Sequence, residues 1–371
     1  MEKWTMTAAP PRRAFLKTGL GVLAGLAGGA ACSTPDLTAR PSEREPHLTE
    51  NYLVHTNLGY AAPAERSHLL DLYLPLAADD PVPVVIFQMG SAFRGGDTKG
   101  KALAEGDDAK VGALPAPGSM LSAPELAALW VPHGYAVVGL NVRSSSQAKF
   151  PAQIHDVKAA IRFLRAHAPT YGLDPDRFAT MGNSSGGWIA TMAALTSGRA
   201  DLEGDLGNPA HSSSVRAAID LFGPTDFLAM DAHRLPDGQV HDAPDSPESE
   251  LMGFPIQADP STVKKASPAT YVTADSPPVF IAHGTADPLV PANQSEILFD
   301  AYVDAGATAT LALLPDVGHT DAYLYAPNYS PGRVVKHTEG GTTTTGSDPA
   351  PTFDALLAFL DAHLNGEGAG R

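Results

Sequence analysis

The sequence predicts an α/β fold built on a mostly parallel, twisted β-sheet. Near-continuous apolar runs recur along the chain, as is typical of strands buried on both faces. Segments with helical spacing separate these runs, which is the pattern of β-α-β units. A length of 371 residues and a hydrophobic fraction of 43% provide enough material for a large core. The expected strands cover residues 82–89, 135–142, 178–181, 215–222, 278–282 and 307–314.

Two amphipathic helices and one alternating strand complete this pattern. Residues 69–74 alternate and stop at Pro75, as an antiparallel edge strand does. A helix is expected over 151–167, and another over 353–364. The apolar face of the first is formed by residues at positions i, i+3, i+7 and i+10, namely Ile154, Val157, Ile161 and Leu164. Helices are therefore expected on both faces of the sheet.

Three polar segments interrupt the alternation of strands and helices. Residues 97–122 are rich in Gly, Pro, Asp and Lys and predict a long surface loop. Residues 228–268 are acidic and rich in Pro, which favours an inserted cap. Residues 336–350 are of low complexity and predict a polar loop. We expect one catalytic domain over 51–365, followed by a short tail over 366–371.

The first 32 residues resemble an export signal. Arg12 and Arg13 open the string RRAFLK, and an uncharged run from Gly19 to Ala31 follows. This run of about 13 residues is too short for an ordinary membrane-spanning helix. The pattern resembles the twin-arginine signal, against the alternative of a basic N-terminus that arose by chance. Residues 33–50 are polar and predict a flexible tether.

Cys32 is the only cysteine of the chain and lies where the apolar run ends. Together with Gly29, Ala30 and Ala31 it resembles a lipobox, which predicts lipidation of Cys32 and attachment to a membrane. The alternative is cleavage after Ala31 and release of a secreted protein. A single cysteine excludes intrachain disulfides, CxxC zinc sites and cysteine-ligated clusters. We expect either a cell-surface lipoprotein or a secreted protein.

The charge of the chain argues against nucleic-acid binding. Its 41 acidic and 25 basic residues give a formal net charge of −16, which would repel a phosphate backbone. No motif for a metal or an organic cofactor is visible, so no cofactor is expected. The sequence does not specify an oligomeric state.

The sharpest motif is Gly182-Asn183-Ser184-Ser185-Gly186, between a predicted strand and a predicted helix. Small residues on both sides allow the sharp turn of a nucleophile elbow with the pattern G-x-S-x-G. Ser184 has glycines at both required positions. Ser185 does not, because Asn183 stands where its first glycine would be. Ser184 is therefore the candidate nucleophile.

A serine hydroxyl needs a base, and in this motif class the acid and the histidine follow the serine in that order. His319 follows a predicted strand and is the candidate base, with His337 as its rival. Asp287 follows the apolar run 278–282 and a Gly turn, where catalytic groups of parallel sheets gather. In the predicted mechanism His319 takes the proton of Ser184, and Asp287 orients the imidazole.

Several further segments carry a family resemblance over residues 60–365. They resemble the esterase and lipase group of α/β-hydrolases, most of all its bacterial carbohydrate-esterase branch of feruloyl and acetylxylan esterases. The resemblance implies an α/β-hydrolase fold and a serine esterase that acts on small-molecule or carbohydrate esters. His155 and Asp156 match the family, and we interpret them as structural. The segments are 70–75, 141–143, 150–156, 171–177, 223–226, 267–269 and 283–287.

An oxyanion hole is expected from backbone N–H groups. Its candidates are Ser185, which follows the nucleophile, and Ser91 and Ala92 in the loop after the strand 82–89. Related enzymes have His-Gly-Gly in this loop. Here Met89 and Ser91 replace the His and the second Gly. Serine at 91 would be strained if that position needed a positive φ.

Aromatic residues near the site suggest the substrate. Phe93, Trp188 and Tyr323 are candidate substrate contacts, and Tyr323 is one of three tyrosines shortly after His319. A tyrosine suits a sugar ring or an aromatic acyl group, although these tyrosines could equally pack the segment onto the body. We predict a preference for short or aromatic acyl esters over long-chain lipids.

Two other functions remain open from the sequence. One is a peptidase or amidase of the prolyl-oligopeptidase type, which shares the fold and the order of the triad. The other is a non-catalytic binding lipoprotein on the same fold. The intact set of Ser184, Asp287 and His319 favours the esterase.

Overall fold

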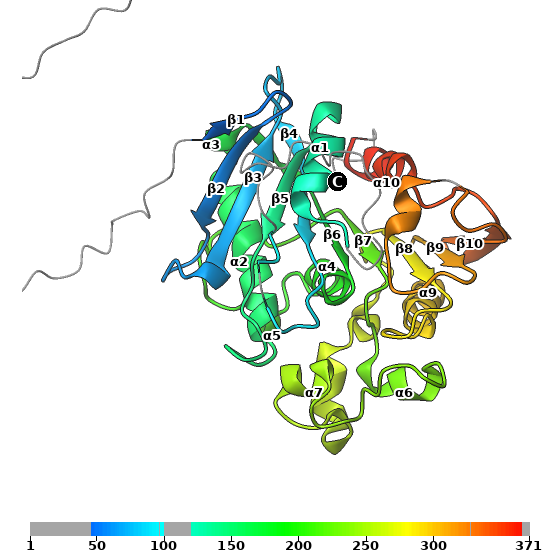
Figure 1. The fold of residues 1–371 in the computed structure, drawn as a ribbon. Helices are drawn as coiled ribbons and strands as arrows, with labels where there is room; N and C mark the ends of the chain where they lie inside the picture. The colour runs from blue at the N-terminus through cyan, green and yellow to red at the C-terminus, as the bar shows by residue number, and fades with distance from the viewer. Residues whose placement is uncertain (1–45, 96, 100–119, 327, 366–371) are drawn as a thin grey trace, which may run out of the picture. The chain divides into compact units, whose positions relative to one another are not determined.

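The structure is a computed structural model that describes residues 46–95, 97–99, 120–326 and 328–365 (Figure 1). The expected signal peptide with Cys32, most of the expected tether and the tail 366–371 lie outside the described residues. Most of the expected loop 97–122 does as well. None of the helices in the described ranges is long and apolar enough to cross a bilayer.

The described residues form one sheet with the strand order β1-β2-β3-β5-β4-β6-β7-β8-β9-β10-β11. The six strands from β5 to β9 in this order are parallel, and antiparallel strands flank them on both sides. The mostly parallel sheet predicted from the sequence is confirmed. The strands are β1 (His47–Leu48), β2 (Leu53–Gly59), β3 (Leu69–Leu74), β4 (Val82–Gln88), β5 (Ala136–Leu140), β6 (Leu173–Asn183), β7 (Ala217–Leu221), β8 (Val279–Gly284), β9 (Ala309–Leu314), β10 (Val334–Glu339) and β11 (Thr342–Gly346).

The central strands are buried because helices cover both faces of the sheet. Every residue of β4, β5, β7 and β8 is buried, as their continuous apolar runs predict. One core contains the apolar sides of α2, α4 and α9, and a second core contains those of α1 and α10. The longer helices are α1 (Ala123–Trp130), α2 (Ala152–Ala166), α4 (Ser185–Leu195), α9 (Asn293–Ala305) and α10 (Phe353–Leu360).

The expected insertion lies between β7 and β8 and contains only short helices. Figure 1 shows α6 and α7 gathered beyond one end of the sheet. The short α-helices of the described residues are α3 (Ala168–Tyr171), α5 (Ala200–Glu203), α6 (Met230–His233), α7 (Pro247–Met252) and α8 (Pro260–Val263). Single turns of other helix types cover Arg66–His68, Val131–His133, Phe227–Ala229, Ile256–Ala258, Lys264–Ala266, Pro268–Tyr271, Ala322–Tyr325 and Asp361–Asn365.

The polar loop predicted over 336–350 is wrong, because most of this segment forms a β-hairpin. Strand β10 pairs with β9, and β11 pairs with β10. Gly340 and Gly341 have φ values of 55° and 77° and form the turn. The four threonines of β11 are β-branched and favour extended backbone. The repetitive, polar sequence of this segment suggested a loop, although its threonines have ordinary β-strand propensity.

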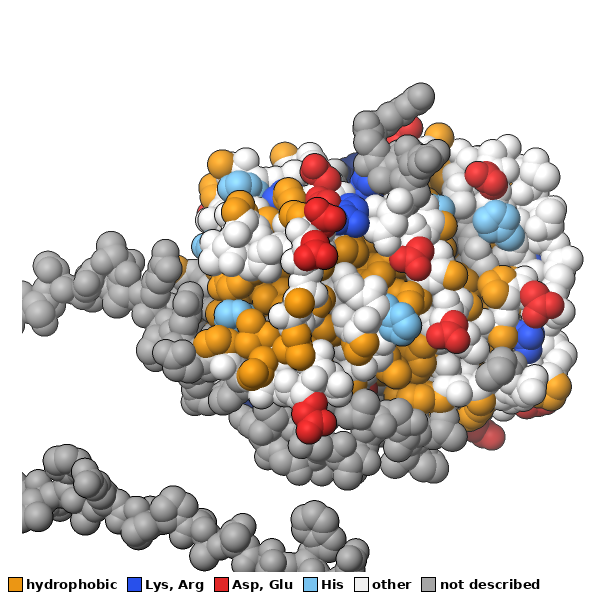
Figure 2. All heavy atoms as spheres, turned by 90° about the horizontal axis from the view of Figure 1, so that it is seen from above, with side chains coloured by type: hydrophobic (Ala, Val, Ile, Leu, Met, Phe, Trp, Pro, Cys, Tyr) orange, Lys and Arg blue, Asp and Glu red, His pale blue; other side chains and the backbone are white. Residues whose placement is uncertain are grey.

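The two ends of the parallel strands differ in character. At their amino ends lies a groove of about 820 Å³. Its lining includes residues that precede β4 and β6, such as Asp80 and Gly172. Figure 2 views the molecule from above, the side of β1, and shows hydrophobic side chains gathered on this face. The groove shares no lining residue with the pocket at Ser184, which follows the carboxyl end of β6.

Candidate active site

Ser184 stands in a strained turn between β6 and α4. Its φ is 55° and its ψ is −130°, a conformation that a residue other than glycine rarely adopts. The turn needs glycine on both sides. A Cβ atom on Gly182 would lie 2.2 Å from the carbonyl oxygen of Gly186, and one on Gly186 would lie 1.9 Å from that of Gln88. These contacts explain the G-x-S-x-G spacing physically.

The structure brings Ser184, His319 and Asp287 into one hydrogen-bonded chain. The Oγ atom of Ser184 lies 2.9 Å from Nε2 of His319, and Nδ1 of His319 lies 2.6 Å from Oδ2 of Asp287. The three residues follow β6, β9 and β8, whose carboxyl ends meet at one edge of the sheet. An imidazole placed between a hydroxyl and a carboxylate can accept the hydroxyl proton.

The carboxylate of Asp287 is buried and held by four groups. Its Oδ1 atom accepts hydrogen bonds from the backbone N–H groups of Leu289 and Val290, at 2.8 and 3.0 Å. Nε2 of His283 lies 3.3 Å from its Oδ2 atom. Burial by itself raises the pKa of Asp287, but the contacts with His283 and His319 outweigh it and hold that pKa well below its usual range. Asp287 is therefore ionised and accepts the Nδ1–H of His319.

His283 is a contact that the sequence analysis missed. Its side chain is fully buried, and Nδ1 lies 2.7 Å from Oγ of Ser295 while Nε2 lies 3.0 Å from the carbonyl oxygen of Val290. From the sequence, His283 stood only within the family segment 283–287 and was given no role. Its spacing of four residues before Asp287 was the available signal.

The loop after β4 differs from the expected oxyanion hole at one residue. The backbone N–H of Ser91 donates to Oγ of Ser185 at 2.9 Å, so this N–H is already used. The positive φ values fall on Ala92 and Phe93, at 50° and 60°, and not on Ser91. Ala92 and Ser185 line the pocket beside Ser184. Ser185 is the first residue of α4, where an N–H group has no partner within the helix.

Asn183 connects the nucleophile turn to two other loops. Its Oδ1 atom accepts the backbone N–H of Gly90 at 2.7 Å, and its Nδ2 donates to Oδ2 of Asp321 at 2.7 Å. The same oxygen of Asp321 accepts the N–H of Leu121 at 2.9 Å. Burial raises the pKa of Asp321 to about 6, against the opposing effect of these donors. This network fixes the loop after β4 relative to Ser184 and His319.

A pocket of about 50 Å³ lies at Ser184, and the insertion between β7 and β8 supplies part of its wall. Phe93 is among the lining residues, as expected. Trp188 and Tyr323 are not, so the expectation that they contact substrate is corrected. The lining residues are Ala92, Phe93, Ser184, Ser185, Pro224, Gln239, Pro247, Glu248, Leu289, Val290 and His319.

Trp188 and Tyr323 are core residues. Trp188 is fully buried, stacks on Phe227 and donates its Nε1–H to the carbonyl oxygen of Ala266 at 2.6 Å. Tyr323 is 2% exposed and belongs to the core on the other face of the sheet. Both side chains bury their apolar rings in the core, and this burial stabilises the fold.

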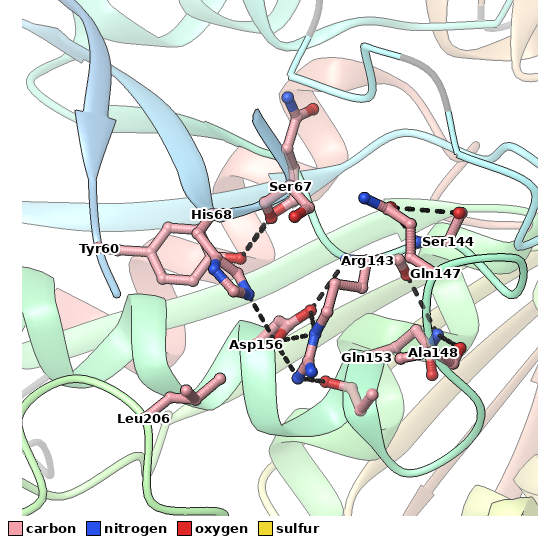
Figure 3. A network of polar contacts seen from close by, with 12 residues as sticks. Tyr60, Ser67, His68, Arg143, Ser144, Gln147, Ala148, Gln153, Asp156 and Leu206 are labelled. Atoms are coloured by element: carbon pink, nitrogen blue, oxygen red, sulfur yellow. Dashed lines mark hydrogen bonds and ion pairs between the residues drawn. The ribbon is translucent and has the colours of Figure 1, made fainter. Parts of the chain in front are cut away.

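Another histidine–aspartate pair connects His68, in the turn before β3, to Asp156 on α2 (Figure 3). Asp156 on α2 is fully buried and receives Nη2 of Arg143 at 2.6 Å and Nε2 of His68 at 3.3 Å. The other nitrogen of His68 lies 3.1 Å from the carbonyl oxygen of Pro63. Among the described residues, no hydrogen bond links His68 to a serine hydroxyl, so the pair fits the structural interpretation of Asp156. Within the described residues no group of acidic, histidine or cysteine side chains is arranged to hold a metal.

Comparisons with known proteins agree with this geometry. The BD-FAE family model matches residues 119–302. A solved structure described as a truncated carbohydrate esterase from gut microbiota is 34% identical, with a TM-score of 0.63. The match covers 77% of this chain and 95% of that one. A bifunctional GH43-CE protein of Bacteroides eggerthii is 29% identical, with a TM-score of 0.60, over 85% of this chain and 38% of that one.

Curated relatives include esterase LipQ of Mycobacterium tuberculosis, which is 34% identical over 50% of this chain and 42% of its own length. The probable carboxylic ester hydrolase LipM of the same organism is 35% identical over 45% of this chain and 37% of its own length. The chain thus spans less than half of these two relatives. The strand order, the nucleophile turn and the extensive match to the carbohydrate esterase structure together show that this chain belongs to the esterase family of α/β-hydrolases.

Proposed function

We propose that this protein is a serine esterase that works through an acyl-enzyme. One observation carries the proposal, which is the chain of contacts from Ser184 through His319 to Asp287. His319 takes the proton of Ser184 as its Oγ attacks the ester carbonyl, and then gives that proton to the leaving alcohol. A water molecule, activated by the same imidazole, then hydrolyses the acyl-enzyme. Asp287 holds the Nδ1–H tautomer and stabilises the imidazolium.

The negative charge of the tetrahedral intermediate needs fixed donors. We assign this role to the backbone N–H groups of Ala92 and Ser185. Both residues line the pocket at Ser184, and Ser185 opens α4, whose N-terminal end favours an anion. The positive φ of Ala92 supports the assignment, because strained backbone is concentrated at functional sites.

The proposed substrates are esters with short acyl groups, among them acylated carbohydrates. The pocket at Ser184 is about 50 Å³, which suits a small acyl group far better than a lipid chain. The relation to a carbohydrate esterase structure supports a sugar as the alcohol. The measurement is kcat/KM across acetyl, butyryl, octanoyl, palmitoyl and feruloyl esters, with aminoacyl amides in parallel. A maximum at palmitoyl or at the amides would contradict this specificity.

The esterase itself is tested by replacing the nucleophile. Ser184→Ala should lower kcat/KM for p-nitrophenyl acetate by about 10⁴-fold or more and abolish labelling by a fluorophosphonate probe. Ser185→Ala is the matched control for the register of the turn. It should still be labelled, since it keeps the Ser184 hydroxyl. If Ser185→Ala loses the label and Ser184→Ala keeps it, the assignment of the nucleophile is wrong.

We also propose that the protein is exported by the twin-arginine route and carries a lipid on Cys32. The support is the string that begins at Arg12 and the cysteine that closes the apolar run. In a bacterial host, Arg12→Lys with Arg13→Lys should leave the protein in the cytoplasm. Cys32→Ala should remove incorporation of labelled fatty acid. Undiminished export of the double variant would exclude this route.

A further inference from the structure

A buried carboxylate lines the pocket, and the proposed hydrolysis does not use it. Glu248 on α7 shares the pocket with Ser184 and His319, yet its residue exposure is only 3%. A buried carboxylate costs free energy unless partners hold it. Most other lining side chains are apolar, small or part of the proposed catalytic machinery. Glu248 is thus the acidic group of a pocket that is otherwise suited to a neutral ester.

The partner of Glu248 is His241, also from the insertion. Nδ1 of His241 lies 2.9 Å from Oε2 of Glu248, and the exposed fractions of the two side chains are 1% and 4%. Burial lowers the pKa of His241, but the hydrogen bond and charge of Glu248, with Asp231 and the backbone of Leu289, outweigh it and raise that pKa. The Nδ1–H of His241 therefore holds one oxygen of this buried carboxylate in place.

Helix α7 is fastened to the body of the protein, so the position of Glu248 is fixed. Nε of Arg94, in the loop after β4, lies 2.8 Å from Oε2 of Glu250. Nζ of Lys149 donates to the carbonyl oxygen of Glu250, and the N–H of Phe150 donates to that of Leu251. Glu248 is thus held next to the loop that carries Ala92.

We propose that Glu248 accepts a hydrogen bond from a free hydroxyl of the substrate and makes the protein selective for esters of polyols and sugars. This inference rests on the proposed esterase function. His241 occupies Oε2, and no hydrogen bond between described residues ends on Oε1. An ionised carboxylate only accepts hydrogen bonds, so its partner in the pocket must be a donor. A hydroxyl of the substrate alcohol is such a donor, and it is small enough for this pocket of about 50 Å³.

A matched pair of esters isolates this contact. 1-Acetylglycerol and n-propyl acetate have the same acyl group and a three-carbon alcohol, and they differ by two hydroxyl groups. Glu248→Leu removes the acceptor, and it should lower the ratio of kcat/KM for acetylglycerol over propyl acetate by roughly 10- to 100-fold. His241→Gln, which keeps the carboxylate but loosens it, should lower the ratio less. Glu296→Gln, which lies on α9 and does not line the pocket, is the matched control and should leave the ratio unchanged.

The ratio separates recognition from damage. A variant that merely folds poorly loses activity on both esters in proportion and keeps the ratio, so an unchanged ratio in Glu248→Leu and His241→Gln overturns the inference. A larger loss on acetylcholine than on acetylglycerol also overturns it, because Glu248 would then attract a positive charge and not accept a hydrogen bond from a hydroxyl. If the parent protein hydrolyses neither these esters nor p-nitrophenyl acetate, the proposed esterase function is wrong, and the role of Glu248 is not what failed.

Discussion

Two buried aspartates of the described residues, Asp287 and Asp156, each contact histidine, but in different surroundings. At Asp287, the second nitrogen of His319 faces the hydroxyl of Ser184 at 2.9 Å, and the imidazole side chain is 11% exposed. At Asp156, the second nitrogen of His68 faces a backbone carbonyl. Arg143 donates hydrogen bonds to the carboxylate from Nε and Nη2. In one pair the imidazole contacts the hydroxyl of the proposed nucleophile, and in the other it contacts a backbone carbonyl.

The difference supports a catalytic role for the pair at Asp287 and a structural role for the pair at Asp156. Arg143 is a permanent cation, so the charge of Asp156 is balanced whatever the proton of His68 does. Asp287 has no such partner among the described residues, and only imidazoles and backbone N–H groups surround it. Its charge therefore remains available to stabilise the imidazolium that forms when His319 takes a proton.

The largest effect is expected when the catalytic carboxylate loses its charge. Asp287→Asn keeps the volume of the side chain, but it removes the charge and replaces one acceptor oxygen by an NH₂ donor, so the tautomer of His319 is no longer fixed. We expect kcat to fall by about 10⁴-fold. The measurement is steady-state hydrolysis of p-nitrophenyl acetate beside a thermal melt. A fall of less than tenfold would show that Asp287 does not have this role.

The structural carboxylate should behave in the opposite way. Asp156→Ala leaves Arg143 and His68 without their buried partner, and we expect the free energy of unfolding to fall by about 3 kcal/mol. Arg143 is 26% exposed, so water relieves part of the cost. Denaturant unfolding measures the loss, and kcat/KM of the folded fraction should stay within about threefold of the parent. A loss of 10³-fold in kcat/KM would make Asp156 part of the catalytic machinery.

A smaller effect on activity is expected at Asn183, which belongs to neither pair. Asn183→Ala removes the acceptor for Gly90 and the donor to Asp321, and so loosens the loop that carries Ala92. We expect kcat to fall by roughly 10- to 100-fold while KM changes little, because misplacement of a transition-state donor acts on the chemical step. Equal losses through KM alone would assign Asn183 to substrate binding.

The smallest effect concerns the protonation of Asp321. Its folded pKa of about 6 exceeds the ordinary value of 3.8, so the folded state binds this proton more tightly than the unfolded state. Its contribution to stability is thus present below about pH 4 and is lost as the pH rises to 6. Asp321→Asn mimics the neutral form and should raise stability at pH 7 by about 1–2 kcal/mol. It should also reduce the slope of stability against pH between 4 and 6, which unfolding titrations at several pH values measure.

Much of the fold could be predicted because its strands are buried on both faces. Runs such as 82–89 and 135–142 have no competing interpretation in a chain of alternating elements. The hairpin Val334–Gly346 could not be predicted in this way, since its threonines are polar and its outer strand is exposed. Its stability depends on pairing with β9, a contact that local composition does not reveal.

In the site, too, the residues that follow regular strands could be predicted from the sequence, and those in irregular segments could not. Ser184, His319 and Asp287 each follow a strand of the parallel sheet, so the order of the strands already places them together. His241 and Glu248 lie in an irregular insertion, where no periodicity indicates which side chains meet. Trp188 and Tyr323 were misjudged because an aromatic residue near a catalytic motif looks the same in the sequence whether it faces the pocket or the core.

The attachment of the insertion to the loop after β4 has a consequence for exchanging parts between relatives. Arg94 holds Glu250 and the carbonyl oxygen of Asp245, so one side of the substrate pocket is a joint between two segments far apart in the chain. A chimera that receives a new insertion without the matching residues of this loop keeps its triad but loses the joint. Libraries that recombine both segments as a single module should retain far more active members than libraries that shuffle them separately.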